Sequence, residues 1–201
     1  QGAVLGEDWK SHVEGTYADV LKSHWMATNI LQKHGPLCAS YEAHGADAVS
    51  PHMAGEFYAE SPSLTFLRLV PNGLGSHINP SYGGWGGRYE LLPGFANVWR
   101  DASNEESPGK SVWRWLTHLQ GDWSARADWC VRGPGRTNHP PAAAVNGNVG
   151  SSVLRAKAKA GQKLSLDASA STDADEQRIG KAWWHYTEAS SYEEMVDMDR
   201  S

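Results

Sequence analysis

The chain has 201 residues, 40% of them hydrophobic, with a formal net charge of -5 and a pI near 6.0. This length can bury one good core or two small ones, and the acidic balance argues against a nucleic-acid-binding protein, which needs a basic stripe. No apolar stretch reaches the length of a membrane span, and residues 1–18 lack the basic and apolar segments of a signal peptide, so we expect neither a membrane partner nor a leader in this sequence.

A first helix is predicted over residues 18–33. Apolar side chains recur there at roughly helical spacing, namely Val20, Leu21, Trp25, Ile30 and Leu31. The turn His34-Gly35-Pro36 follows and is expected to end the helix.

The most distinctive stretch is residues 65–92, which opens with a short apolar run from Phe66 to Val70. The run has the length of a buried strand, and Pro71-Asn72-Gly73 stops it with a turn signal. A strand that ends in a polar, glycine-bearing loop is where an open α/β sheet places its ligand site. The sequence therefore predicts a buried strand with a site at its end.

Farther along the same stretch, four glycines surround Trp85 and precede Arg88 and Tyr89. So many glycines indicate backbone with positive φ or with close neighbours. Two interpretations remain open, a connection that packs its own tryptophan and a loop that forms a site.

A second helix is predicted over residues 111–129, where apolar side chains again fall near helical spacing. Its polar face carries Asp122 and Arg126, whose i,i+4 spacing suits an ordinary ion pair.

The two cysteines, Cys38 and Cys130, show no CxxC or Cys/His spacing, so we expect no zinc site. They are either free or joined in one disulfide in an oxidising compartment.

Composition shifts after Trp129. Residues 133–141 are rich in glycine and proline, as in a linker. Beyond them, short alternating segments lie between turn signals, which is the spacing of strands in a β-sandwich. The expected core of that sandwich consists of Leu164, Leu166, Trp183 and Trp184.

The loop of residues 167–175 is rich in aspartate and serine. Asp173 and Asp175 could bind Ca²⁺, but such residues more commonly bond their own backbone in turns. The loop also resembles a turn of PKD-like, immunoglobulin-like modules.

Several longer motifs point to one family. PNGL at residues 71–74 and GGWGGRYEL at 83–91 resemble the signature of secreted cellulose-binding proteins with a nucleoside hydrolase-like domain. Further resemblances keep the family's order along the chain: HGPL at 34–37, WRW at 113–115, GDWSARADW at 121–129, NHPP at 138–141, LDASASTDAD at 166–175 and WWHYTEA at 183–189.

The resemblance implies an α/β fold, the C-terminal portion of a nucleoside hydrolase-like domain, over residues 1–132. A linker would follow over residues 133–141, and residues 142–201 would be the N-terminal portion of an all-β Ig/PKD-like sandwich. The family also implies secretion and a polysaccharide or glycoside ligand.

The resemblance further implies candidate site residues. Glu60 and Asp122 would be catalytic carboxylates, and Asp122 would also bind calcium. Contacts to the substrate would come from Asn72, Trp85, Arg88 and Tyr89.

Two departures from the family weaken the case for an enzyme. Pro62 stands where the family carries an aspartate, and proline offers no side-chain oxygen. The aspartate-rich loop that supplies most calcium ligands in nucleoside hydrolases does not occur in these 201 residues.

Three functions are consistent with this sequence. The chain is a cellulose-binding protein, a glycosidase of nucleoside hydrolase type that cleaves an N- or O-glycosidic bond, or a truncated remnant without activity. Because a parallel sheet without its first strands exposes an edge, we also expect either marginal stability or a homodimer.

Overall fold

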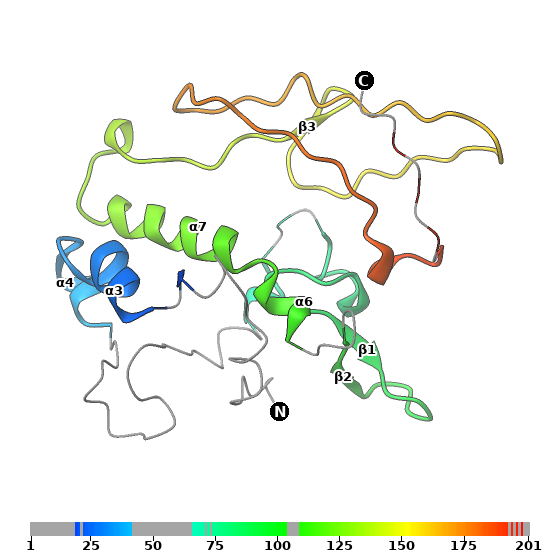
Figure 1. The fold of residues 1–201 in the computed structure, drawn as a ribbon, viewed down its shortest axis with the longest axis horizontal. Coiled ribbons are helices and arrows are strands. Elements are labelled where there is room, and N and C mark those ends of the chain that lie inside the picture. Colours follow the sequence, from blue (N-terminus) through cyan, green and yellow to red (C-terminus); the bar gives the residue numbers. More distant parts are fainter. Residues whose placement is uncertain are drawn as a thin grey trace.

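The computed structural model describes residues 19–20, 22–41, 66–70, 72, 74–103 and 109–192, together with 194, 196 and 198. The longest element is helix α7, Leu116–Trp129, which crosses the middle of the molecule (Figure 1). Helices α3 and α4 lie at one end of α7, the hairpin of β1 and β2 extends beyond the other, and the chain after residue 140 passes over it (Figure 1).

The first helical segment is shorter than predicted and contains a wide turn. Helix α3 spans Ser23–Met26 and continues as a π-turn over Ala27–Leu31, in which the N–H of Gln32 donates to the Ala27 carbonyl at 2.9 Å. The segment ends before the HGPL motif. Gly35 and Pro36 instead begin a new helix, α4, Gly35–Ala39, since proline is favoured at a first helical position.

A small core joins these helices to α7. Its buried members come from three segments and are Met26, Ile30, Cys38 and Ala127, with Trp25, Tyr41 and Trp123 packed around them. Gln120 is also buried and donates to the Val20 carbonyl at 2.9 Å. The face of α7 turned toward α3 therefore carries both apolar contacts and a satisfied polar one.

The second predicted helix is present but interrupted. Helix α6 spans Lys110–Trp113, and α7 begins at Leu116. Between them the N–H of Trp115 bonds to the Val112 carbonyl three residues back at 3.0 Å, which is a tighter turn than an α-helix makes.

Both sheets of the described residues are two-stranded and antiparallel. Strand β1, Tyr89–Leu91, pairs with β2, Trp99–Asp101, and strand β3, Ala144–Val145, pairs with β4, Asn148–Val149. Short 3₁₀ turns occupy Pro80–Tyr82, Pro134–Arg136 and Thr187–Ala189.

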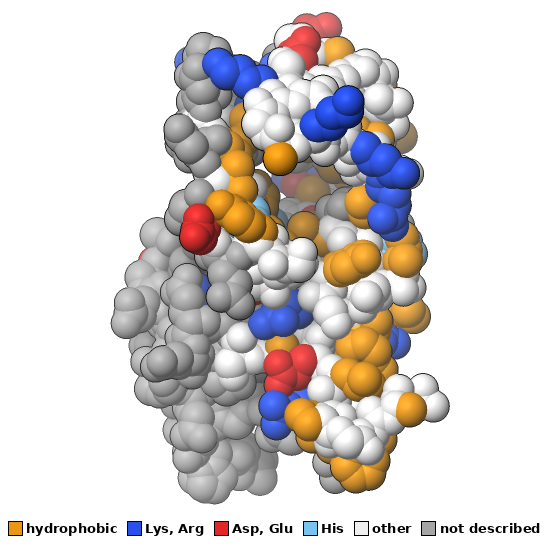
Figure 2. All heavy atoms as spheres, turned by 90° about the vertical axis from the view of Figure 1, so that its right-hand side faces the viewer, with side chains coloured by type: hydrophobic (Ala, Val, Ile, Leu, Met, Phe, Trp, Pro, Cys, Tyr) orange, Lys and Arg blue, Asp and Glu red, His pale blue; other side chains and the backbone are white. Residues whose placement is uncertain are grey.

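Hydrophobic side chains gather on the face shown in Figure 2. Exposed ones on the β1–β2 hairpin are Leu91, Phe95, Val98 and Trp99. Dimer formation through any surface stays a prediction.

The prediction of a buried strand at residues 66–70 is wrong. Phe66 is 68% exposed and Leu69 is 55% exposed. The N–H groups of Leu69 and Val70 donate to carbonyls three residues earlier, as in a turn. These two donors are therefore not used to pair with a neighbouring strand. Within the described residues, the parallel sheet expected around this run is absent.

The predicted Ig/PKD-like sandwich is not confirmed. The described residues from 142 onward form only the β3–β4 pair and a single bridge between Ala142 and Thr172. Leu164, Leu166 and Trp184 are exposed and do not form the expected core. Among the helices that the structure describes, none has the length and apolar character needed to cross a bilayer.

Candidate functional site

The glycine-rich motif forms a tight turn with Trp85 at its tip. Gly84 and Gly87 exchange both backbone hydrogen bonds, at 3.1 and 3.0 Å. Gly83 and Gly87 have φ values of 75° and 94°, which favour glycine. The predicted need for positive φ is therefore confirmed.

Close packing is a second reason why glycine occupies positions in this turn. A Cβ added at Gly83 would lie 2.7 Å from the Tyr186 hydroxyl, and one at Gly84 would lie 2.8 Å from Ser76 Oγ. The Ser76 hydroxyl in turn donates to the Arg68 carbonyl at 2.7 Å. The glycines thus let the turn press against the loop that follows the PNGL motif and against the C-terminal segment.

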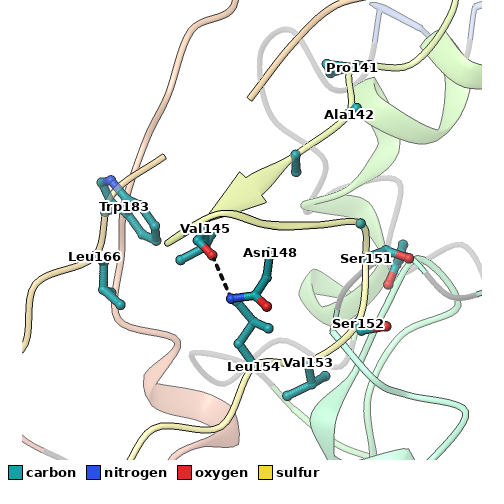
Figure 3. A pocket seen from close by; sticks show the side chains of 13 residues that line it. Pro141, Ala142, Val145, Asn148, Ser151, Ser152, Val153, Leu154, Leu166 and Trp183 are labelled. Atoms are coloured by element: carbon teal, nitrogen blue, oxygen red, sulfur yellow. Dashed lines mark hydrogen bonds between the residues drawn. The ribbon is translucent and has the colours of Figure 1, made fainter. Parts of the chain in front are cut away.

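A pocket of about 490 Å³ opens beside that loop. One wall is Asn72, and the others come from the chain after residue 140, including Asn148, Ser151, Leu154 and Trp183. Figure 3 shows Trp183 and Leu166 on one side of the pocket and Ser151 and Ser152 on the other, with Asn148 between them.

Asn72 is the most informative group in this pocket. Its N–H donates to the Val70 carbonyl at 3.0 Å, and its Oδ1 accepts from the Leu74 N–H at 3.4 Å, so the backbone turn fixes the side chain. Its Nδ2 is buried and has no hydrogen-bond partner in the described structure. A buried amide donor without an acceptor is costly. This atom lies 3.6 Å from the Cβ position of Gly84, next to the glycine-rich turn.

The opposite wall is ordered by its own hydrogen bonds. Asn148 Nδ2 donates to the Val145 carbonyl at 3.3 Å, as Figure 3 shows, and to the Asn146 carbonyl at 3.4 Å. Val153 contacts the loop that contains Asn72, because its Cγ2 lies 3.1 Å from the Cβ position of Gly75. The two walls therefore touch at one edge of the pocket.

Trp183 precedes a segment that is firmly attached to the α6–α7 junction. The Trp115 ring contacts Trp184 at 6.4 Å and Tyr186 edge-on at 6.3 Å between centroids. Arg114 lies over both the Trp115 ring and the Tyr186 ring, at 5.2 and 5.1 Å, and pairs with Glu188 at 2.6 Å. This anchoring positions Trp183 in the pocket wall.

The chemistry of the lining suits a ligand with both apolar and hydroxyl surfaces. An indole ring offers a flat apolar face, and the amides and serine hydroxyls offer donors and acceptors. The described lining contains no carboxylate, imidazole or thiol. It is therefore equipped to hold a neutral polar ligand.

The structure places the predicted substrate contacts in different surroundings. Asn72 lines the pocket, whereas the described lining does not include Trp85, Arg88 or Tyr89. Arg88 donates to the Ser103 carbonyl at 2.9 Å, and Tyr89 donates to the Gly86 carbonyl at 3.3 Å. Burial, and then the charge of Asp101, raise the pKa of the Tyr89 phenol.

Asp122 and Glu60 were predicted as catalytic carboxylates, and Glu60 lies outside the described residues. Asp122 lies on α7, and both of its oxygens accept from Arg126, at 2.7 and 3.4 Å. Calcium takes six to eight oxygen ligands, but within the described ranges no three His, Cys, Asp or Glu side chains gather around a common point. In the described residues both Asp122 oxygens bond Arg126, and the calcium role of Asp122 and the catalytic roles of both carboxylates stay predictions.

The aspartates of the Asp-rich loop bond their own surroundings. Asp173 Oδ1 accepts from the N–H groups of Asp175 and Gln177, at 2.9 and 3.2 Å. Asp175 accepts two bonds from His139, from the N–H at 2.6 Å and from the ring at 3.0 Å, and these lower its pKa. The NHPP and DASASTDAD motifs thus meet in one set of hydrogen bonds.

Sequence reasoning missed most of the pocket wall. In the sequence, Asn148 lies among the turn signals between predicted strands, and Trp183 lies in the predicted core of the sandwich. Nothing in the sequence singles out Ser151 and Ser152. Only the PNGL motif drew attention to this place, through Asn72.

Two family models match separate parts of the chain. Residues 3–89 match the model of the nucleoside hydrolase-like domain of cellulose-binding Sde182, and residues 163–201 match the model of the C-terminal domain of cellulose-binding protein Sde0182. No curated protein matches the chain.

A solved structure is also similar, that of a nucleoside hydrolase-related hypothetical protein from Saccharophagus degradans that is associated with carbohydrate metabolism. It is 30% identical with a TM-score of 0.67, and the alignment covers 92% of this chain and 43% of that one. The chain therefore has a nucleoside hydrolase-like fold of mixed helices and small sheets, and it spans less than half the length of that relative.

Proposed function

We propose, from the matches of residues 3–89 and 163–201 to two domain models of the Sde182 family, that this chain is a cellulose-binding protein. In this proposal the pocket between Asn72 and Trp183 holds a sugar unit of the polysaccharide. The observation that carries it is one pocket lined by Asn72, Asn148, Ser151, Ser152 and the indole of Trp183, in which Asn72 has an amide Nδ2 without a hydrogen-bond partner.

A sugar ring matches this lining in two respects. Its hydroxyl oxygens can accept from Asn72 Nδ2, and its C–H face can lie against the indole of Trp183. The volume of about 490 Å³ falls within the range of small-molecule sites, about 300 to 1,000 Å³. We therefore propose that the pocket binds a short portion of a polysaccharide chain.

Binding is proposed here without hydrolysis. General acid–base cleavage of a glycosidic bond needs two carboxyl groups beside the bond, and the described lining contains none. A glycosidase that uses Asp122 and Glu60 would have to act elsewhere on the molecule. Since cellulose lies outside cells, the proposal includes an extracellular protein.

The test is retention on microcrystalline cellulose, with cello-oligosaccharide titrations run beside it. We expect Asn72→Ala and Trp183→Ala each to weaken oligosaccharide binding by about 5- to 100-fold, as expected for the loss of a buried contact. Trp99→Ala is the matched control, because Trp99 is an exposed tryptophan on β2 outside the pocket lining.

Two results would overturn the proposal. One is the absence of retention for the folded unsubstituted chain. The other is a loss of binding in Trp99→Ala that the two pocket variants do not share. A calcium titration run in parallel tests the separate prediction of a calcium-dependent activity at Asp122.

A further inference from the structure

The two cysteines, Cys38 and Cys130, lie at the other end of α7 from the anchored C-terminal segment. The structure records both thiols as free, Cys38 buried and Cys130 exposed. They come from helix α4 and from the residue that follows α7.

Several contacts bring these two segments together, independently of the thiols. His34 Nε2 lies 3.2 Å from Asp128 Oδ1, and the Cβ position of Gly35 lies 3.0 Å from Val131 Cγ1. Cys38 packs in one buried cluster with Ala127 of α7. Figure 1 shows α4 beside this end of α7.

The packing brings both thiols to the same contact between α4 and the end of α7. Cys38 packs with Ala127, Cys130 follows Ala127 by three residues, and Cys130 Sγ lies 3.4 Å from the Arg126 carbonyl oxygen. Burial, and then this neighbouring thiol, raise the pKa of Cys38. The buried thiol therefore reacts slowly with outside reagents, whereas its exposed neighbour is accessible.

We propose that Cys38 and Cys130 are a redox-active pair that a small-molecule disulfide converts to an intramolecular disulfide. The Cys130 thiolate attacks one sulfur of the reagent, forming a mixed disulfide and releasing one thiol. The Cys38 thiolate then attacks the Cys130 sulfur, which forms the protein disulfide and releases the second thiol. The two protein thiols are oxidised, their protons leave to solvent or to the released thiolates, and one small-molecule disulfide is reduced to two thiols.

The disulfide would fasten α4 to the end of α7. Because it closes a long loop of chain, it restricts the unfolded state strongly. This property belongs to the core of the first domain and does not depend on ligand binding at the pocket.

The test uses the full chain and oxidised glutathione, followed by intact-mass measurement and titration of thiols. We expect both thiols to disappear, with no retained glutathione and no covalent dimer. The oxidised chain should melt about 4 to 15 °C higher than the reduced chain. In the folded chain, the disulfide should form at least about tenfold faster than in urea. In urea the chain is unfolded, and the two thiols are connected only through a long flexible loop.

Single variants separate the two roles. Cys38→Ser should retain glutathione on Cys130, whereas Cys130→Ser should stay largely unreacted because Cys38 is only 8% exposed. Two surviving thiols in the unsubstituted chain would overturn the inference. A stable glutathione adduct or a covalent dimer as the main product would also overturn it. All three outcomes are measured on the unsubstituted chain, so they do not depend on a variant that folds.

Discussion

Arg114 and Glu188 form an ion pair at 2.6 Å between the α6–α7 junction and the C-terminal segment, although 74 residues separate them in sequence. Their side chains are 21% and 15% exposed, so solvent screens this pair less than a surface pair. Because Arg114 also lies over two aromatic rings, it occupies the centre of the contact that positions Trp183.

Removing one partner of this pair should therefore destabilise the chain. We expect Glu188→Ala to lower the free energy of unfolding by about 1 to 3 kcal/mol, since it leaves a half-buried guanidinium without its carboxylate. The same variant should weaken ligand binding at the pocket. Urea unfolding and oligosaccharide titration measure the two effects. Asp122→Ala is the control, since its partner Arg126 is well exposed, and a loss as large there would contradict the prediction.

The Arg114–Glu188 pair also predicts a pH dependence. Burial alone would raise the pKa of Glu188, but backbone hydrogen bonding and Arg114 outweigh it, so the folded pKa is lowered. The unfolded chain then binds the proton more readily. The stabilisation is present above the unfolded value of about 4.3 and is lost as pH falls through the lower folded value.

Urea titrations between neutral and acidic pH measure this dependence. Glu188→Gln should flatten the acid limb of the curve. An unchanged limb in that variant would show that other carboxylates cause the loss of stability.

The glycine-rich turn offers a test of close packing against backbone strain. Gly83 and Gly94 both have positive φ, but a Cβ at Gly94 meets no atom within 4 Å. We expect Gly94→Ala to cost about 1 to 2 kcal/mol from backbone strain. Gly83→Ala should cost about 1 to 3 kcal/mol more, because Trp115 and Arg114 hold the Tyr186 ring against it. Thermal unfolding measures both variants. Equal losses of stability in Gly83→Ala and Gly94→Ala would show that the Tyr186 side chain moves aside at little cost.

The small core predicts a large effect from one buried aliphatic residue. Ile30 is 1% exposed and belongs to the cluster that joins the first helical segment to α7. Ile30→Ala should lower stability by about 2 to 5 kcal/mol and Ile30→Val by about 0.5 to 1.5 kcal/mol. Val149→Ala on exposed β4 should change it by less than about 0.5 kcal/mol. Denaturant unfolding gives all three values, and a similar loss at both sites would contradict this view of the core.

Local sequence pattern predicted the helices well and the strands poorly. Leu116–Trp129 is helical, and its buried side chains Leu116, Gln120 and Ala127 share one face at intervals of four and seven residues, a local spacing that sequence can show. The run at residues 66–70 has the same apolar content as a strand, but strand formation depends on a partner, and a short apolar run does not reveal one. The interruption at Trp115 arises next to contacts with Tyr186, far along the chain, and no local pattern encodes them.

The candidate site likewise has one residue that local sequence predicted and several that it did not. Asn72 was found because PNGL is a turn motif that also resembles a family signature. Asn148, Ser151 and Trp183 reach the pocket only through tertiary packing across more than seventy residues, and their types are those of ordinary turns and cores. Spacing in one sequence does not report such contacts.

The pocket takes one wall from the PNGL loop and the others from the chain beyond residue 140. A recombination event that exchanged only one of these two parts would replace half of the ligand site and leave the remaining half without its complement. Under the proposed function, selection for binding would keep both parts together in one gene, and a chain that lost one part would have to rebuild that wall before it could bind the sugar again.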